Sequence, residues 1–234
     1  MLYIAMMLFS LIVGISSSWA LDKEQAKYLE RDMSDLFMLE HGGPDFVMED
    51  GVVIAKLYNY EVSKERGEVH TFLGERVLGT PEKVREFLRG FIKEGMVEFR
   101  SHPFPGAGNP KEALFNGALG LVGGGVLKDP TMEPILLQIL LDPQFDELYR
   151  DSAMISLADL NFDKYFSTFM KFVLPGLPGR GGLGHTTEHV IHRWASATQL
   201  DEFEAVIAKH PNEHWKRYVT TRIAERRAEL KKGP

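Results

Sequence analysis

Residues 133–143 read EPILLQILLDP and residues 150–160 read RDSAMISLADL, and this pair of runs decides the predicted fold class. The first run is strongly apolar and stops at Asp142 and Pro143, where a helix is not expected to continue. In the second run, four residues recur at helical spacing on one face: Ala153, Met154, Leu157 and Leu160. One helix pair cannot bury its own apolar stripes, so we expect it to stack on neighbouring helices.

Helix signals of the same kind recur along most of the chain. Thr80 and Asn109 each precede a proline, which places an N-cap residue before a proline at the first helical position. The helix that follows Thr80 carries a predicted buried stripe of Val84, Phe87, Leu88, Phe91 and Ile92. Further helices are expected over residues 21–39, 109–122, 132–141, 148–160, 161–173, 185–198, 201–209 and 212–231.

Alternating strand patterns of useful length are nearly absent from the sequence. Residues 51–60 are rich in β-branched side chains, but Val53, Leu57 and Tyr60 keep a helical spacing, which favours a helix there. We therefore predict an all-α fold of stacked helical pairs, either an α-solenoid or an irregular helical array.

Composition limits the classes of function. The chain has 234 residues, 44% of them apolar, which suffices for one domain without covalent cross-links. A formal charge of −6 gives no electrostatic reason to expect nucleic acid as a partner. There are no cysteines, which excludes disulfides, thiolate zinc sites and cysteine nucleophiles.

The first twenty residues have the outline of a secretory signal. They contain no charged side chain, and small residues at Ser18 and Ala20 fit a cleavage site before the polar sequence that follows. We expect residues 1–20 to be a signal peptide, residues 21–234 to be one helical domain, and the protein to be periplasmic or secreted. The alternative is an uncleaved anchor, but the apolar run is shorter than the ~20 residues that a membrane-spanning helix needs. No membrane span is expected after cleavage.

The pair of runs at residues 133–160 resembles a HEAT-type repeat. That family typically has a proline in the first helix, an aspartate at the turn and an arginine that opens the second helix. The resemblance is best over about residues 131–174, where 159–173 looks like the start of the next repeat. It implies a HEAT-like α-solenoid with a scaffold or partner-binding role, and it places Asp142 and Arg150 in the polar ladder of the array.

Histidines cluster in residues 185–192, HTTEHVIH, which contain the order H-x-x-E-H of inverted zinc peptidases. At helical spacing His185, Glu188, His189 and His192 share one face, which is predicted to point away from the core. An i,i+4 histidine pair can chelate a metal, so His185 and His189 are the predicted ligands of a zinc ion. A solvated polar face explains the same pattern.

These patterns lead to two hypotheses of function. The first is an exported, non-enzymatic interaction or scaffold module that binds a protein partner and has no catalytic or cofactor-binding residues. The alternative is a metal-binding protein or zinc-dependent hydrolase that uses His185, Glu188 and His189.

Overall fold

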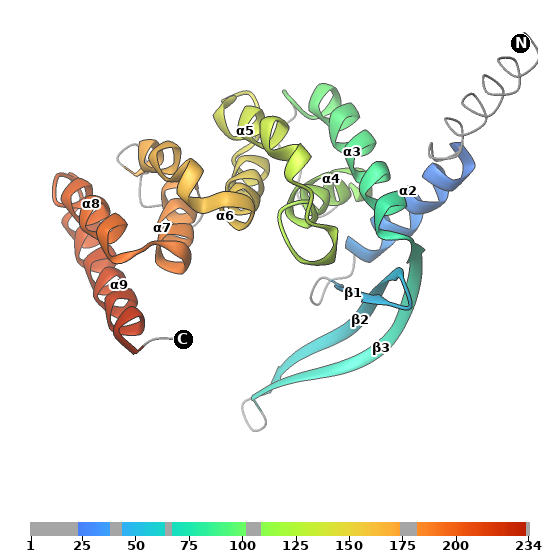
Figure 1. Cartoon of the computed structure of the whole chain (residues 1–234), viewed down its shortest axis with the longest axis horizontal. Helices are drawn as coiled ribbons and strands as arrows, with labels where there is room; N and C mark the ends of the chain where they lie inside the picture. Colours follow the sequence, from blue (N-terminus) through green and yellow to red (C-terminus); the bar gives the residue numbers. More distant parts are fainter. Residues whose placement is uncertain (1–22, 38–43, 64–66, 102–108, 174–181, 233–234) are drawn as a thin grey trace, which may run out of the picture. The chain divides into compact units, whose positions relative to one another are not determined.

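The computed structural model describes residues 23–37, 44–63, 67–101, 109–173 and 182–232. Eight α-helices and a three-stranded sheet occupy these residues (Figure 1), so the prediction of a mostly helical protein is confirmed. The chain divides into two compact units, of which the first ends at Gly90 and the second begins at Phe91. A single domain over residues 21–234 stays a prediction.

The expected signal peptide at residues 1–20 lies outside the described residues. Within the described ranges, no helix combines the length and the apolar character needed to cross a membrane.

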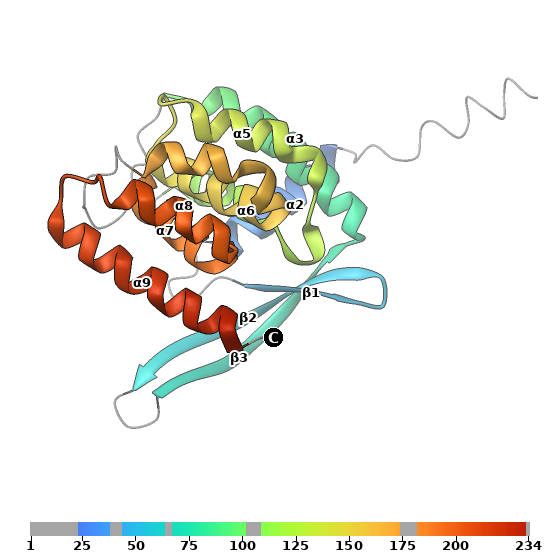
Figure 2. The ribbon, with the colours of Figure 1, turned by 60° about the vertical axis from the view of Figure 1, so that its left-hand side comes forward.

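The first unit combines a helix with an antiparallel sheet. Helix α2 (Lys23–Phe37) precedes strands β1 (Asp45–Glu49), β2 (Val52–Ser63) and β3 (Gly67–Gly79), which lie in the order β1-β2-β3 (Figure 2). The ring centroids of Phe37 in α2 and Phe46 in β1 are 6.3 Å apart, and Arg76 Nη1 in β3 lies 3.5 Å from Asp32 Oδ1 in α2. Helix α2 therefore packs near the sheet. Helix α3 (Pro81–Glu98) begins in this unit.

The prediction of a helix at residues 51–60 was wrong, because residues 52–60 belong to β2 and Gly51 to the turn before it. The turn between β1 and β2 holds Asp50 at φ 48° and Gly51 at φ 78°. Two successive positive φ values define the turn that matches the twist of a hairpin, and Asp-Gly is a favoured sequence for it. This dipeptide was the signal that the helical spacing of Val53, Leu57 and Tyr60 obscured.

The regular elements among the described residues of the second unit are all helices. After the last turns of α3 come α4 (Pro110–Leu121), α5 (Glu133–Leu141), α6 (Glu147–Phe169), α7 (Leu183–Trp194), α8 (Ala197–Ile207) and α9 (Glu213–Lys232). Helix α6 packs against α4, α5 and α7, while α9 packs against α7 and α8 (Figure 1). The order in the chain is therefore close to the order of packing.

The helix boundaries follow from capping side chains. The Asn109 side chain accepts a hydrogen bond from the Lys111 amide, which confirms the predicted cap of α4. Ser196 and Gln199 form a reciprocal capping box at α8. Asn161 has non-helical φ and ψ angles inside α6 and accepts from the Lys164 amide, so it divides α6 into two helical segments. This division lies where the sequence predicts one helix to end and another to begin.

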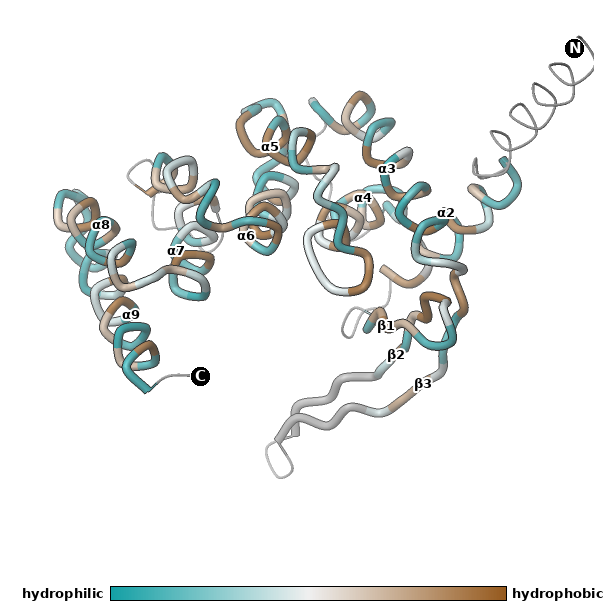
Figure 3. The backbone as a smooth tube through the Cα atoms, viewed as in Figure 1, coloured by the Kyte–Doolittle hydropathy of each residue, from teal (hydrophilic) through white to brown (hydrophobic). Residues whose placement is uncertain are grey.

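Apolar stripes form the core. Val84, Phe87, Leu88, Phe91 and Ile92 are all buried, as predicted, and so are Ala153, Met154 and Leu157. Figure 3 shows α5 as largely hydrophobic and α9 as largely hydrophilic. Phe115 of α4 lies 4.9 Å from Phe99 and 5.0 Å from Tyr149 of α6, measured between ring centroids. This aromatic cluster joins three helical segments of the second unit.

Gly123 lies where the chain after α4 passes close to α6. A Cβ atom at this position would lie 2.5 Å from the Cα atom of Ser156, whose hydroxyl donates to the Leu119 carbonyl. We expect Gly123→Ala to lower the free energy of unfolding by about 1–3 kcal/mol, because backbone rather than a flexible side chain would have to move. Urea denaturation of the full chain measures this.

Gly120 supplies a matched control within α4 itself. It is exposed, and a Cβ there would meet no atom within 4 Å. Gly120→Ala should therefore stabilise the protein by about 0.5–1 kcal/mol through helix propensity. Equal effects of the two substitutions would contradict the close contact at Gly123.

Candidate functional site

Helix α7 carries the predicted metal ligands. His185 and His189 are both exposed, as expected. The His185 ring lies against the carboxyl-terminal helix, with its centroid 6.2 Å from that of Trp215 and 6.5 Å from that of Tyr218. The His185 ring therefore lies beside two aromatic rings of α9.

The prediction that the whole face points away from the core was wrong for Glu188 and His192. Glu188 is only 2% exposed, and its carboxylate accepts from Arg222 Nε at 3.2 Å and from the Tyr218 hydroxyl at 3.4 Å. Helix α9 covers this face because Arg222 and Tyr218 supply partners for a buried carboxylate. A carboxylate engaged in this way is poorly placed to act as a general base.

His192 is partly buried, and its Nε2 atom has no hydrogen-bond partner among the described residues. Burial lowers the pKa of its imidazole, and the nearby Arg222 charge lowers it further. The ring is therefore kept neutral near neutral pH.

Within the described ranges, no three His, Cys, Asp or Glu side chains are grouped so that they could hold a metal ion. His185 Nδ1 lies 4.0 Å from a Glu188 oxygen that already faces Tyr218. Zinc binding by His185 and His189 stays a prediction.

Asp151 of α6 faces the start of α7. Burial raises the pKa of its carboxyl to about 6, although a hydrogen bond with Thr186 opposes this shift. Its Oδ1 atom is buried without a hydrogen-bond partner among the described residues. The ionised form of Asp151 is therefore destabilised in the folded protein.

We expect Asp151→Asn to stabilise the protein near neutral pH. In the unfolded chain this carboxyl ionises near its ordinary value of 3.8, whereas the folded state holds it protonated up to about pH 6. The wild-type protein therefore loses no stability from Asp151 below the ordinary pKa of 3.8. It loses stability as the pH rises from there through the folded-state pKa of about 6. Asparagine removes this loss, so the variant should be more stable by about 1 kcal/mol at neutral pH, after allowance for partial exposure.

Urea denaturation of both proteins across this pH range measures the difference in stability. The gain should shrink towards zero as the pH falls below the ordinary aspartate value. A gain that does not change with pH would contradict a perturbed Asp151 carboxyl.

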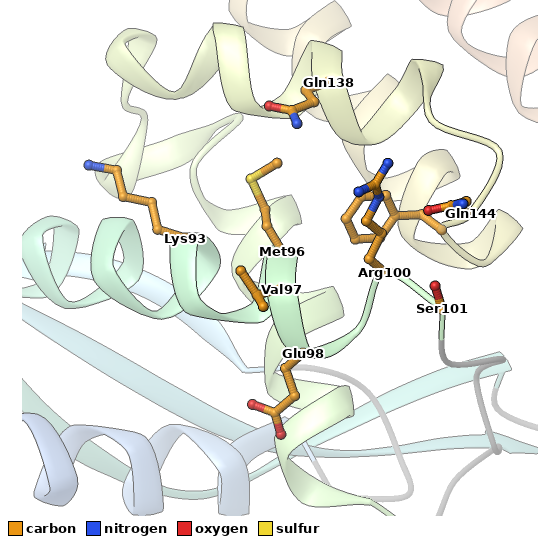
Figure 4. A pocket seen from close by; sticks show the side chains of 9 residues that line it. Lys93, Met96, Val97, Glu98, Arg100, Ser101, Gln138 and Gln144 are labelled. Atoms are coloured by element: carbon orange, nitrogen blue, oxygen red, sulfur yellow. The ribbon is translucent and has the colours of Figure 1, made fainter.

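A second site is a groove with a volume of about 560 Å³ in the second unit. It lies between the last turns of α3 and the segment from α5 to the start of α6 (Figure 4). Its lining residues are Lys93, Met96, Val97, Glu98, Arg100, Ser101, Gln138, Gln144 and Phe145. In Figure 4 Lys93 and Arg100 lie at opposite ends, with Met96 and Val97 between them.

The groove combines an exposed apolar surface with polar groups that have spare hydrogen-bonding capacity. Val97 is 85% exposed, although it belongs to a helix whose other large apolar residues are mostly buried. The side-chain amides of Gln138 and Gln144 make no hydrogen bond to another described residue. Such a surface suits a ligand that offers both apolar groups and backbone amides.

Asp142 holds Arg100 at the end of the groove. Arg100 Nε donates to Asp142 Oδ2 at 2.7 Å, and the backbone amide of Gln144 donates to Asp142 Oδ1 at 3.0 Å. The hydrogen bond from that amide, together with Arg100, lowers the pKa of the Asp142 carboxyl. Arg150, the expected ladder partner, instead donates to the Leu140 carbonyl at 3.0 Å. The aspartate at the turn therefore positions a residue just beyond the end of α3.

Sequence reasoning did not identify this groove. Its residues come from segments about 40 positions apart, and no motif connects them. The one available signal was Val97, an apolar residue outside the buried stripe predicted for α3. Single exposed apolar residues are common on protein surfaces, so this signal is weak in a single sequence.

The chain matches no protein-family model, no curated protein and no solved structure.

Proposed function

We propose that this protein is an exported, non-enzymatic interaction module that binds a peptide segment of a partner protein in the groove between α3 and α5. The observation that carries the proposal is the exposed side chain of Val97 beside the side-chain amides of Gln138 and Gln144, which bond to no described residue, in one groove. Helical arrays bind partners on such surfaces, because adjacent helices jointly present side chains from distant parts of the sequence.

The packing of the second unit supports a HEAT-like arrangement. Helices α5 and α6 form the pair that resembles the repeat, and the break at Asn161 lets the end of α6 act as a separate helix beside α7. Helices α8 and α9 form the last pair, and α9 is rich in exposed charged residues. A polar final helix is what a terminal repeat requires.

A random peptide library displayed on phage, panned against the full chain, tests the proposal. Peptides enriched on the wild type should bind Val97→Glu at least about tenfold more weakly, because an ionised carboxylate would replace an apolar contact. Leu230→Glu on α9 adds the same charge at another exposed apolar position and should leave binding unchanged. Equal binding to wild type and both variants would remove the groove as the site.

The zinc alternative makes a separate prediction about α7. Calorimetric titration of the full chain with zinc, compared with His189→Ala, would have to show tight stoichiometric binding that the substitution abolishes. A flat titration of the wild type would exclude a zinc-dependent function for His185 and His189.

A further inference from the structure

The two ends of the groove carry cationic side chains. Lys93 and Arg100 are seven residues apart, and the chain between them is helical as far as Glu98. At 1.5 Å per residue the helical part rises about 7.5 Å, and Phe99 and Arg100 extend the chain beyond it, so the Cα atoms of Lys93 and Arg100 are about 10 Å apart along the groove. Figure 4 shows Gln138 above the middle of this interval and Gln144 beside Arg100.

Both cations retain binding capacity. Lys93 is exposed and makes no ion pair with any described residue. Arg100 uses Nε for Asp142, so its two terminal nitrogens remain without a partner among the described residues. An arginine held at Nε is preorganised, because its side chain no longer has to be ordered when a carboxylate binds.

The acidic residue in the lining does not cancel this charge. Glu98 accepts from Lys111 Nζ at 2.5 Å, and Figure 4 shows its side chain directed away from Met96 and Gln138. The lining residues with their ion-pair partners therefore have an excess of one positive charge, from Lys93, on a chain whose formal charge is −6. The groove is a cationic site on an acidic protein, which selects for an acidic ligand.

We propose that the groove binds a peptide in the polyproline II conformation that carries two carboxylate side chains three residues apart. This conformation has three residues per turn, so side chains at i and i+3 lie on one face about 9.3 Å apart, close to the spacing of Lys93 and Arg100. In a β-strand, residues on one face are roughly 6.7 Å or 13 Å apart, which fits the spacing less well.

The remaining lining residues match the rest of such a peptide. The polyproline II backbone has no internal hydrogen bonds, so its carbonyl and amide groups are free to bind the amides of Gln138 and Gln144. Met96 and Val97 lie between the two cations and offer an apolar surface to the intervening residues, for which proline is well suited. The inference rests on the proposed function, and it adds a ligand conformation and a charge pattern.

Fluorescence anisotropy of the full chain with labelled proline-rich peptides tests this pattern. The probes are a peptide with two aspartates three positions apart, the same peptide with asparagines, and one with the aspartates two positions apart. We expect the first to bind about tenfold more tightly than the asparagine peptide, which forms neither ion pair, and about threefold more tightly than the third peptide, which still forms one. The preference over the asparagine peptide should decrease as salt is added.

Charge reversal provides the second arm of the test. Lys93→Glu should lose the preference for the diaspartate peptide and should bind better than wild type a peptide in which lysine replaces one of the aspartates. Circular dichroism checks that this exposed substitution leaves the fold intact. Equal binding of the aspartate and asparagine peptides, with no effect of Lys93→Glu, would overturn the inference.

The outcomes separate this inference from the proposed function. If peptides enriched by panning need Val97 but show no acidic preference, the charge pattern is refuted and the peptide-binding function stands. If panning enriches nothing that depends on Val97 and no labelled peptide binds, both proposals are refuted.

Discussion

Replacing Phe115 with alanine is expected to lower the free energy of unfolding by about 3–5 kcal/mol, the cost of removing a large buried ring. Phe115 is fully buried between Phe99 and Tyr149, and the Gly95 side of α3 lies close against its ring. The cavity would form where α3, α4 and α6 meet, so neighbouring side chains cannot fill it without moving a helix. Urea denaturation of the full chain gives the value.

Val97→Ala is the control for this substitution. It also removes apolar atoms from the second unit, but from a side chain that is 85% exposed, so it should change stability by less than about 0.5 kcal/mol. A loss at Phe115 no larger than the loss at Val97 would show that the aromatic cluster does not hold the helices together.

Replacing Arg222 with methionine is expected to cost about 2–4 kcal/mol, because it leaves the Glu188 carboxylate buried without its cationic partner. The arginine side chain is itself 31% exposed, which places the loss towards the lower part of the range found for buried pairs. Thermal and urea unfolding measure this loss, and the hydrogen bond from Tyr218 compensates for only part of it.

Two further variants isolate the effect of the buried carboxylate. Glu225→Ala removes the exposed partner of Arg222, whose Nη1 donates to Glu225 at 2.8 Å, and should cost less than about 1 kcal/mol. Glu188→Gln in the Arg222→Met background should recover part of the stability, because a neutral amide is cheaper to bury than a charge. If the double variant were no more stable than Arg222→Met, the loss would not come from an unpaired buried charge.

The helices of the second unit could be predicted because each has a local cause. Asn109 with Pro110, and the break at Asn161, mark helix ends within a few residues of sequence. The apolar stripe from Val84 to Ile92 correctly predicts which side chains are buried, because helical spacing places them on one face. The hairpin was missed because its turn signal, Asp50-Gly51, is only two residues long beside a helical spacing of larger residues.

The sites were less predictable because they depend on which helix covers which. Helical spacing correctly placed Glu188 on one face with His185 and His189, but it could not show that Arg222 and Tyr218 would cover that face. The groove depends on Arg100 meeting Asp142, a contact between residues 42 positions apart. Such tertiary contacts leave no periodic signal in a single sequence.

Amide hydrogen exchange of the full chain, with and without a peptide enriched by panning, tests peptide binding in the groove most directly. We predict slower exchange in peptides covering residues 93–101 and 138–145, because bound peptide would cover the turns that line the groove. Slower exchange confined to α7 and α9, or no change anywhere at saturating peptide, would contradict the account.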